Sequence, residues 1–390
     1  MKRFIRKNVS CRKSFCVLKS AFLCLTVIIL MVSAAAADQG NKKITVMSRN
    51  LYVGADILKV FEVAANPNAG PLDIPKAVAE IFETIQYTDF QERAQAIADE
   101  IERWQPDLIG LQEVSEILEQ VPGDYLSGNQ KPAEEVVYDY LSILMEALEE
   151  RGLCYEVAGE VTGADVELPM LAGYTGGYPI LKDVRLIDHD VILARKGVEV
   201  KTVVAGNFST NISMPIGGTG INFKRGYIIA EVKVDQRKLR FVNTHLEIGG
   251  GPGDVLSAVQ AAQMHELLTI LAGEDKPAVL LGDLNSTPEE TPIESLSYGL
   301  IVPPYMQAVN SGYIDIFSVP KKLPEPTCCF NETVDDPDAS LDTRIDHIFV
   351  SDSLDIKKPK PRTIGDKESD MNPTGLWPSD HAGVIGTIKF

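Results

Sequence analysis

An apolar strand that ends at an acidic residue and an amide is the feature that most restricts the fold of this chain. Val279, Leu280 and Leu281 predict a fully buried strand, and the run stops at Gly282. Asp283 and Asn285 follow two positions apart, so the alternation of a strand points both side chains the same way. A carboxylate can accept a proton from water, and a neighbouring amide can donate and accept hydrogen bonds. This pair therefore suits the attack of water on a phosphate. A strand of any α/β protein can end this way, so the other motifs decide.

The first 37 residues differ from all that follow. They contain seven Lys and Arg residues and no acidic residue, then an apolar run from Ala21 to Val32 and small residues up to Ala37. This pattern predicts a secretory signal peptide cleaved near Asp38. The alternative is a retained membrane anchor, but the apolar run is about a dozen residues, short of the roughly twenty that span a bilayer. We therefore expect residues 38–390 to be secreted or to lie in the periplasm or cell envelope.

The exported part is strongly acidic. Of the 37 Lys and Arg residues, 30 remain after the seven are removed, against 55 Asp and Glu, so it carries about 25 negative charges. Tight, non-specific binding to long nucleic acid needs many cationic side chains, and this balance argues against it. No linker or repeat divides residues 38–390, so we expect one large domain. Cys154 remains beside the neighbouring Cys328 and Cys329, so a bridge from Cys154 to either stays open.

The first half of the domain predicts alternating helices and strands. Residues 43–48 alternate like a strand and lead to Asn50, and the helical spacing of residues 90–104 precedes an apolar strand that ends at Glu113. Ligands of open α/β sheets gather at strand ends, where a carboxylate can hold Mg²⁺ or Mn²⁺. Residues 133–152 predict a second amphipathic helix, and glycines 173, 176 and 177 predict a loop. We interpret His189 as a residue that enters a buried strand.

The second half predicts further strand ends. Residues 226–234 and 238–243 form a predicted hairpin whose second strand leads to His245, and Asp254 is the expected N-cap of a helix through Leu271. Residues 287–290 (Thr-Pro-Glu-Glu) predict another helix start. Asp346 lies between apolar residues, an unfavourable position unless a cation compensates its charge, and His381, which follows Asp380, can supply one. No G-x-S-x-G, H-E-x-x-H or paired C-x-x-C motif is present.

Taken together, these motifs resemble the endonuclease/exonuclease/phosphatase superfamily. The resemblance spans about residues 44–390 and rests on SRNLY, GLQEV, NTHLE, LLGDLNSTP, RIDHIFVS and PSDH, in the order of that family. It implies a DNase I-like fold, an α/β structure with four layers: two packed mixed β-sheets flanked by helices. The site would then lie at one rim between the sheets.

The resemblance also implies residue roles. Asp283 and Asn285 would activate and orient the attacking water, Asp346 would fix His381, and His381 and His245 would face the phosphoryl oxygens. Asn50, Glu113 and Asp380 would hold one or two Mg²⁺ or Mn²⁺ ions. Several members carry an acidic residue where this chain has Tyr52, which favours a single metal ion or help from Asp56. Among the basic residues, Arg225 and Arg185 are the expected substrate contacts.

These features predict a secreted, metal-dependent phosphodiesterase that uses water to hydrolyse a nucleic acid or a phospholipid head group. Ser286 and Thr287 follow the Gly-Asp-x-Asn motif and disfavour the inositol polyphosphate phosphatases, which usually carry an aromatic residue and Arg there. An extracellular endonuclease is the main alternative, and a metal-free binding module of the same fold is a second. Nothing in the sequence implies a stable protein partner.

Overall fold

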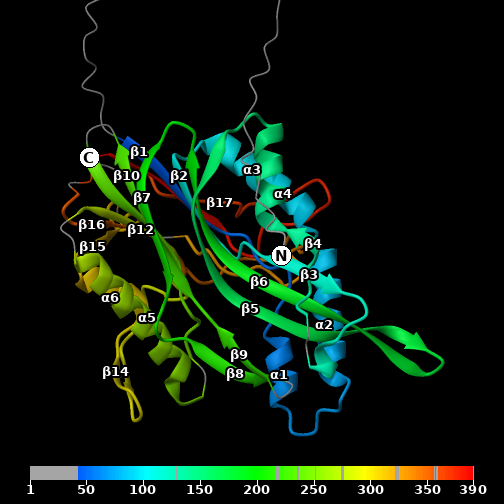
Figure 1. Ribbon diagram of the computed structural model, residues 1–390. Helices are drawn as coiled ribbons and strands as arrows, with labels where there is room; N and C mark the ends of the chain where they lie inside the picture. The colour runs from blue at the N-terminus through cyan, green and yellow to red at the C-terminus, as the bar shows by residue number, and fades with distance from the viewer. Residues whose placement is uncertain are drawn as a thin grey trace, which may run out of the picture.

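Two mixed β-sheets form the centre of the structure, a computed structural model. It describes residues 43–128, 131–216, 219–234, 237–250, 252–273, 276–320, 325–354, 356 and 359–389. The expected signal peptide, residues 1–37, lies outside these ranges, so it stays a prediction. Figure 1 shows the two sheets packed face to face with helices on both outer sides. The expected four-layered α/β sandwich is therefore confirmed.

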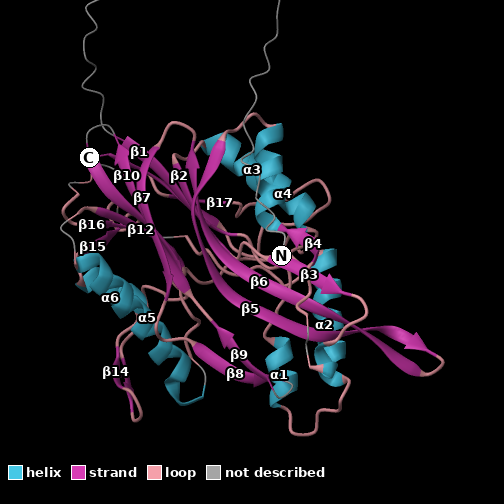
Figure 2. Ribbon diagram, viewed as in Figure 1, coloured by secondary structure: helices cyan, strands magenta, loops and turns pink. Residues whose placement is uncertain are grey.

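The first sheet joins the start and the end of the domain. Its strand order is β17-β18-β1-β2-β6-β3-β4, and β5 pairs with β6. The two longest strands, β5 and β6, extend beyond the other strands as a hairpin (Figure 2). The strands are β1 (Lys43–Asn50), β2 (Leu108–Gln112), β3 (Glu116–Gln120), β4 (Glu135–Asp139), β5 (Tyr155–Thr175), β6 (Tyr178–Arg195), β17 (Arg362–Ile364) and β18 (Gly383–Lys389).

The second sheet has the order β15-β16-β12-β11-β10-β7, and two short hairpins, β8-β9 and β13-β14, stand apart from both sheets. The buried run at residues 279–281 forms β12, as the sequence predicts. The strands are β7 (Glu199–Asn207), β8 (Ile212–Ile216), β9 (Thr219–Phe223), β10 (Gly226–Val234), β11 (Arg237–His245), β12 (Ala278–Asp283), β13 (Ile293–Ser295), β14 (Gly299–Ile301), β15 (Tyr313–Asp315) and β16 (Asp346–Ser351).

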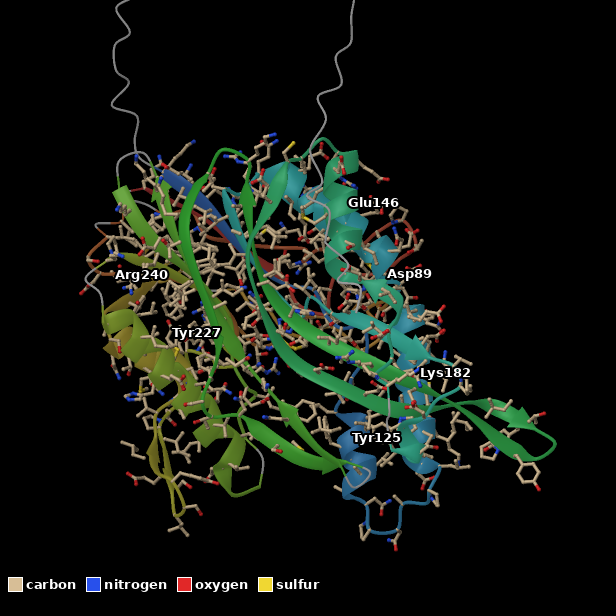
Figure 3. All side chains as sticks on the ribbon, viewed as in Figure 1. Asp89, Tyr125, Glu146, Lys182, Tyr227 and Arg240 are labelled. Carbon is tan, nitrogen blue, oxygen red and sulfur yellow. A yellow bond between two sulfur atoms is a disulfide. The ribbon has the colours of Figure 1, made fainter. Side chains whose placement is uncertain are left out.

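Three apolar layers hold the sandwich together. Between the sheets, side chains such as Val46, Ile192, Phe241 and Val279 are fully buried, and Figure 3 shows this space filled with side chains. A second layer lies between the first sheet and helices α3 and α4, and a third between the second sheet and α5. The helices are α1 (Lys59–Ala65), α2 (Asp73–Tyr87), α3 (Phe90–Trp104), α4 (Tyr140–Glu150), α5 (Val255–Ala272) and α6 (Pro304–Asn310).

The structure corrects the helix predicted over residues 133–152. Its first part is strand β4, where Tyr138 pairs with Ile117 of β3, and helix α4 begins only at Tyr140. Asp139 separates the two elements because its carboxylate accepts a hydrogen bond from Ser142 N (2.9 Å) and caps the helix. The β-branched residues Val136 and Val137 favour the strand over the helix.

Two further predictions are wrong in detail, and two others are refined. Residues 287–290 form a turn, because Pro292 follows within one helical turn and disfavours helical backbone at the residue before it. Asp254 precedes α5, but its side chain makes no capping hydrogen bond. The glycine-rich loop is the tight turn between β5 and β6, where Gly176 and Gly177 have positive φ angles (54° and 83°) that fit the strand twist. A disulfide joins Cys328 to Cys329, so Cys154 pairs with neither.

Candidate active site

Polar side chains from both sheets meet at one rim of the sandwich. β11 runs parallel to β12, so that His245 pairs with Asp283, and β12 runs antiparallel to β16, so that Asp283 pairs with Asp346. β1 brings Asn50 to the same rim from the first sheet. We call the following set the rim cluster: Asn50, Glu113, His245, Asp283, Asn285, Asp346, Asp380 and His381.

The backbone around Asp283 depends on Gly282. Gly282 has a φ angle of 139°, and a Cβ atom there would lie 1.8 Å from the carbonyl oxygen of Thr244 on β11. Only glycine fits this close approach of two strands. Asn285 is in the left-handed region (φ 49°), which Asn tolerates better than most residues. Its backbone N–H donates to Asp283 Oδ1 (2.9 Å), and its side chain donates to the carbonyl of Leu246 (3.0 Å).

Asp283 is the centre of the rim cluster. Its Oδ2 accepts a hydrogen bond from Asn50 Nδ2 (3.2 Å) and lies 3.6 Å from His245 Nε2 and 3.9 Å from His381 Nε2. The residue is 1% exposed. Burial, followed by the nearby charge of Asp346, raises the pKa of Asp283 to about 7. A carboxylate with such a pKa can accept a proton near neutral pH.

The two histidines next to Asp283 differ in charge. His381 Nδ1 donates to Asp346 Oδ2 (2.8 Å). Burial alone would lower the pKa of His381, but Asp346, Asp380 and Asp283 together outweigh it and raise this pKa well above its usual value. For His245, burial and the neighbouring Arg225 lower the pKa well below its usual value. His381 is therefore cationic at neutral pH, and His245 is neutral.

A third carboxylate lies on the first-sheet side of the rim cluster. Asn50 Nδ2 donates both to Glu113 Oε1 (2.9 Å) and to Asp283, so one amide nitrogen links the two carboxylates. Glu113 Oε2 accepts from Val53 N (2.8 Å), and Asp380 Oδ1 lies 4.0 Å from His381 Nε2. Burial raises the pKa of Asp380 to about 6.

The resemblance predicts an acidic ligand where this chain has Tyr52, with Asp56 as its substitute. The Tyr52 backbone N–H donates to Asn50 Oδ1 (2.8 Å), and its buried hydroxyl donates to the carbonyl of Glu332 (2.8 Å). Asp56 is exposed, and its carboxylate accepts from Leu58 N (3.0 Å) in its own loop. Tyr52 thus supports Asn50 through its backbone, and the structure does not bring Asp56 into the rim cluster.

Asp188, Asp190 and Arg225 extend the polar region next to the rim cluster. Arg225 Nη1 donates to His245 Nδ1 (2.9 Å) and lies 4.0 Å from Asp188 Oδ2. Burial raises the pKa of Asp188 to about 6, and burial together with Asp188 raises that of Asp190 well above its usual value. The Oδ1 atom of Asp190 is buried without a hydrogen-bond partner among the described residues.

The sequence interpretation singled out His189 and missed the two aspartates beside it. His189 Nδ1 lies 3.0 Å from Glu160 on β5 and is part of that strand pair. Positions 188 and 190 are two apart on β6, so they point to the opposite face from His189, the face that also carries the inter-sheet core residue Ile192. The alternation of the strand was the signal that could have identified them.

Of the two arginines expected to contact substrate, only Arg225 lies against the rim cluster. Arg185 is on β6, where its Nε and Nη2 donate to the two carboxylate oxygens of Asp165 (2.6 Å each). This fixed guanidinium lines a separate pocket, described below.

The donor set of the rim fits a divalent metal ion. Glu113, Asp188, Asp190, Asp283 and Asp380 bring carboxylates into one buried region, and burial raises the pKa of four of them, which shows that their charge is poorly compensated. Hard oxygen ligands and negative charge are what a small divalent cation requires. Oxygens of Asp283 and Asp346 also lie within 4.8 Å of a nitrogen of His381. The pair His381–Asp346 is bonded internally, and Glu113 and Asp380 remain the candidate ligands.

One family model and several solved structures are similar to this chain. A model of the "Endonuclease/Exonuclease/phosphatase family" matches residues 85–381. Similar solved structures include truncated TDP2 of Caenorhabditis elegans (17% identity, 89% of this chain and 98% of that chain covered, TM-score 0.47). A mannosyl-6-phosphatase of Bacteroides thetaiotaomicron is also similar (18%, 89% and 100%, 0.48). None of the curated proteins compared matches the sequence. Since the family model covers most of the chain, this protein belongs to the endonuclease/exonuclease/phosphatase family, whose members hydrolyse phosphoester bonds.

Proposed function

We propose that the rim cluster catalyses metal-dependent hydrolysis of a phosphoester by direct attack of water. The observation that carries this proposal is the arrangement around Asp283. A buried carboxylate with a pKa of about 7 lies within 4 Å of one cationic and one neutral imidazole, each held by a second partner. No covalent nucleophile is required. We propose that the substrate is a phosphodiester, either of a nucleic acid or of a phospholipid. The alternative is that the protein acts specifically as a nuclease.

Asp283 and Asn285 are the proposed water-activating residues. Asp283 Oδ2 accepts the proton of the attacking water, and the backbone bond from Asn285 to Oδ1 keeps the carboxylate in one rotamer. The Asn285 side chain lies 3.3 Å from His245 Nε2, so it orients the attacking water on the side of Asp283 that faces His245. A base with a pKa near the working pH combines the correct protonation state with a sufficient driving force.

The histidines are the proposed hydrogen-bond donors to the phosphoryl oxygens. His381 donates from Nε2, because its Nδ1–H is engaged by Asp346. Arg225 Nη1 lies 2.9 Å from Nδ1 and 3.2 Å from Nε2 of the neutral His245 ring, and the tautomer we propose carries its proton on Nε2, which lies 3.6 Å from Asp283 Oδ2. Donors fixed before the reaction stabilise charge that develops in the transition state without further reorganisation.

Glu113 and Asp380 are the proposed metal ligands, with Asn50 in support. A bound Mg²⁺ or Mn²⁺ ion, one or two in number, would supply Lewis-acid polarisation of the phosphoryl group and neutralise its charge. The hydrogen bonds of Asn50 to Glu113 and Asp283 hold both carboxylates at a fixed separation. This makes Asn50 a positioning residue for the ligand set as well as a ligand candidate.

The test is hydrolysis of bis-(p-nitrophenyl) phosphate by metal-free protein to which Mg²⁺ or Mn²⁺ is added back. We expect activity with metal, loss in excess EDTA, and loss in His381→Ala. Asp99→Asn, an exposed carboxylate on α3 that pairs with Arg151, is the matched control and should retain activity. Plasmid DNA and sphingomyelin are assayed in parallel to choose the substrate. No turnover of any of the three substrates with either metal would reject the proposal.

We also propose that the domain is exported, on the basis of the first 37 residues alone. Their basic start, apolar run and small residues support cleavage near Asp38. Amino-terminal sequencing of the protein recovered from an expressing cell tests this. A mature start near Asp38 supports export, and an intact Met1 on a cytoplasmic protein contradicts it.

A further inference from the structure

Cys328 and Cys329, which form a disulfide, lie next to the rim cluster. The chain at residues 327–330 runs beside residues 380–382, and two backbone hydrogen bonds of 2.8 Å join the segments, one on each side of His381. We call the two sulfur-bearing residues the cysteine pair. It is held directly alongside the imidazole that we propose as a hydrogen-bond donor to the phosphoryl group.

The segment that carries the cysteine pair is also bonded to the strand that carries Asp346. Thr327 Oγ1 accepts hydrogen bonds from the backbone N–H groups of Ile345 and Asp346 (3.1 Å each). Phe330 stacks on Trp377, with ring centroids 4.0 Å apart. The cysteine pair therefore has a fixed position relative to both partners of the imidazole–carboxylate pair.

The cysteine pair and the imidazole together form a set of metal-binding atoms. One ring nitrogen of His381 and the two sulfur atoms all lie within 4.8 Å of one another. Atoms that bind one Zn²⁺ ion at about 2.0–2.3 Å lie about 3–4 Å apart, so side-chain rotations can bring these three into ligand geometry once the S–S bond is open. Thiolate and imidazole are ligands that Zn²⁺ prefers, whereas Mg²⁺ prefers oxygen. The set therefore selects a different ion from the oxygen ligands of the rim cluster.

This set can be reached from solvent, and carboxylates surround it. Cys329 is exposed, whereas Cys328 is 3% exposed and His381 is 5% exposed. An ion can therefore enter at the outer sulfur and be held by buried ligands. Oxygens of Asp346 and Asp380 lie 2.8 Å and 4.0 Å from nitrogens of the imidazole, and their negative charge favours a cation.

We propose that the reduced cysteine pair and His381 bind Zn²⁺ or another thiophilic divalent cation, and that this ion inhibits hydrolysis. A dithiol opens the disulfide: the S–S bond breaks, the cysteines gain two electrons and two protons, and the dithiol is oxidised to its own disulfide. Zn²⁺ then binds both sulfurs as thiolates, and their protons and that of the coordinating ring nitrogen pass to water. The inhibition rests on the proposed catalytic role of His381.

Coordination through either ring nitrogen leads to inhibition. An ion on Nδ1 would replace the hydrogen bond to Asp346 Oδ2 (2.8 Å). An ion on Nε2 would occupy the atom that we propose as the phosphoryl donor, 3.9 Å from Asp283 Oδ2. The protein would be inactive where thiols stay reduced and active after the disulfide forms. Since disulfides persist outside the cytoplasm, this would spare the phosphoesters of the producing cell before the proposed export.

The test compares the oxidised and the reduced protein. Hydrolysis of bis-(p-nitrophenyl) phosphate in excess Mg²⁺ is titrated with Zn²⁺, before and after treatment with dithiothreitol and its anaerobic removal. We expect the Zn²⁺ concentration for half inhibition to fall at least about a hundredfold on reduction, because two thiolate ligands are added. Zn²⁺ that displaces Mg²⁺ from oxygen ligands inhibits both forms alike, so the difference isolates the cysteine pair. Equal concentrations in both forms would overturn the proposal.

Serine variants identify the sulfur atoms that are responsible. Cys328→Ser and Cys329→Ser should each hydrolyse the substrate near the wild-type rate without Zn²⁺, and each should lose the extra Zn²⁺ sensitivity that reduction brings. Cys154→Ser is the matched control and should keep this sensitivity, because Cys154 lies just before β5, where its carbonyl accepts from Lys196 N (2.8 Å). Sensitivity retained in both serine variants, or activity lost on reduction without Zn²⁺, would contradict the proposal.

Co²⁺ gives a readout that does not depend on turnover. The reduced wild type should show sulfur-to-cobalt charge-transfer absorption that Cys154→Ser keeps and the double variant Cys328→Ser/Cys329→Ser lacks. His381→Ala should raise the Co²⁺ dissociation constant at least about tenfold. Equal absorption in the wild type and the double variant would overturn the metal site. If no phosphoester is hydrolysed with any metal, the hydrolase proposal and the inhibition fail together, and the cobalt absorption still decides whether the metal site exists.

Discussion

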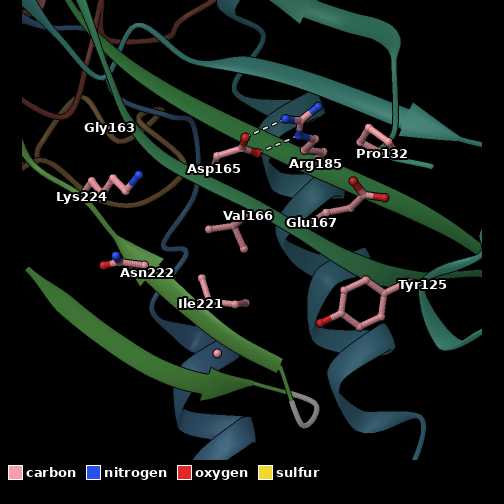
Figure 4. Close-up of a pocket in the computed structure, with 11 residues that line it drawn as sticks. Tyr125, Pro132, Gly163, Asp165, Val166, Glu167, Arg185, Ile221, Asn222 and Lys224 are labelled. Carbon is pink, nitrogen blue, oxygen red and sulfur yellow. Dashed lines mark hydrogen bonds and ion pairs between the residues drawn. The ribbon is translucent and has the colours of Figure 1, made fainter. Parts of the chain in front are cut away.

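The rim cluster and the hairpin pocket, the cavity of about 420 Å³ lined by Tyr125, Glu167 and Arg185 among others (Figure 4), differ in how tightly their side chains are held. In the rim cluster, Asp283, Asp346 and His381 are 5% exposed or less, and hydrogen bonds join Asn50 to Asp283 and His381 to Asp346. In the hairpin pocket, Tyr125 and Glu167 are half-buried, and each has an unused polar atom. The central strands thus hold the proposed reacting groups more tightly than the peripheral hairpin holds the side chains of its pocket.

The largest effect that this contrast predicts is in Asp283→Asn. The amide cannot accept the proton of water, so we expect kcat with bis-(p-nitrophenyl) phosphate to fall about thousandfold. The melting temperature should not fall, because the change removes a buried carboxylate whose charge is poorly compensated. Steady-state kinetics and a thermal melt measure both. Activity within tenfold of wild type would place the base elsewhere.

A smaller loss is expected for Asp346→Asn. The Asn side chain keeps the size but removes the charge that helps to raise the pKa of His381, so this pKa falls. We expect kcat/KM to drop about a hundredfold, the typical loss for one transition-state donor, and the basic limb of the pH profile to move to lower pH. The matched control is Asp352→Asn, an exposed carboxylate just after β16. A pH profile that does not move would contradict the role of the pair.

The pH dependence of the free energy of unfolding tests His347, a buried histidine that supports the chain next to Asp283 and Asn285. His347 Nε2 bonds to the carbonyl of Ser286 (2.8 Å), and burial lowers the pKa of His347 to about 4. Between this pKa and the unfolded value near 6.5, the unfolded chain binds more protons, so stability falls as pH decreases. We expect this residue alone to cost about 2 kcal/mol of the free energy of unfolding between pH 7 and pH 5.

Urea unfolding at pH 7 and pH 5 measures this loss. His347→Gln should reduce the pH dependence by about that amount, although it lowers stability at both pH values. His265→Gln, on the outer part of α5, serves as the control. An equal pH dependence in His347→Gln and wild type would show that the buried imidazole titrates normally.

The smallest effect concerns the backbone at Asn285. Because its φ angle is 49°, Asn285→Gly should be more stable than Asn285→Ala by about 1 kcal/mol. Both variants lose the side chain that contacts Leu246 and His245, so both should lose activity alike. Denaturant unfolding and kinetics on the pair give this comparison. An alanine variant as stable as the glycine variant would show that the strain is absent.

The rim cluster was largely predictable from sequence, and the hairpin pocket was not. Asn50, Glu113, His245 and Asp283 each follow an apolar strand, and strand ends of one α/β sandwich converge at the same rim. Arg185, by contrast, was expected to contact substrate on the basis of charge alone. Its pairing with Asp165 depends on the register of two long strands, which local patterns do not specify.

The errors in the secondary structure have local causes. β4 precedes α4 within a stretch of apolar residues whose spacing fits a helix, and the pairing with β3 decides the outcome. The turn at residues 287–290 carries good helix-start residues, but the second proline ends any helix before it is one turn long. In one case a tertiary strand pairing, and in the other a closely following proline, outweighs a favourable local pattern.

The most direct test of this account is a Mn²⁺ titration of metal-free protein, followed by electron paramagnetic resonance and by activity. We predict that Glu113→Gln and Asp380→Asn each raise the Mn²⁺ dissociation constant at least about tenfold, and that the Mn²⁺ concentration for half-maximal hydrolysis rises in parallel. Asp99→Asn should bind Mn²⁺ as the wild type does. Unchanged Mn²⁺ affinity in both variants, with full activity retained, would contradict a metal-dependent hydrolytic centre at this rim.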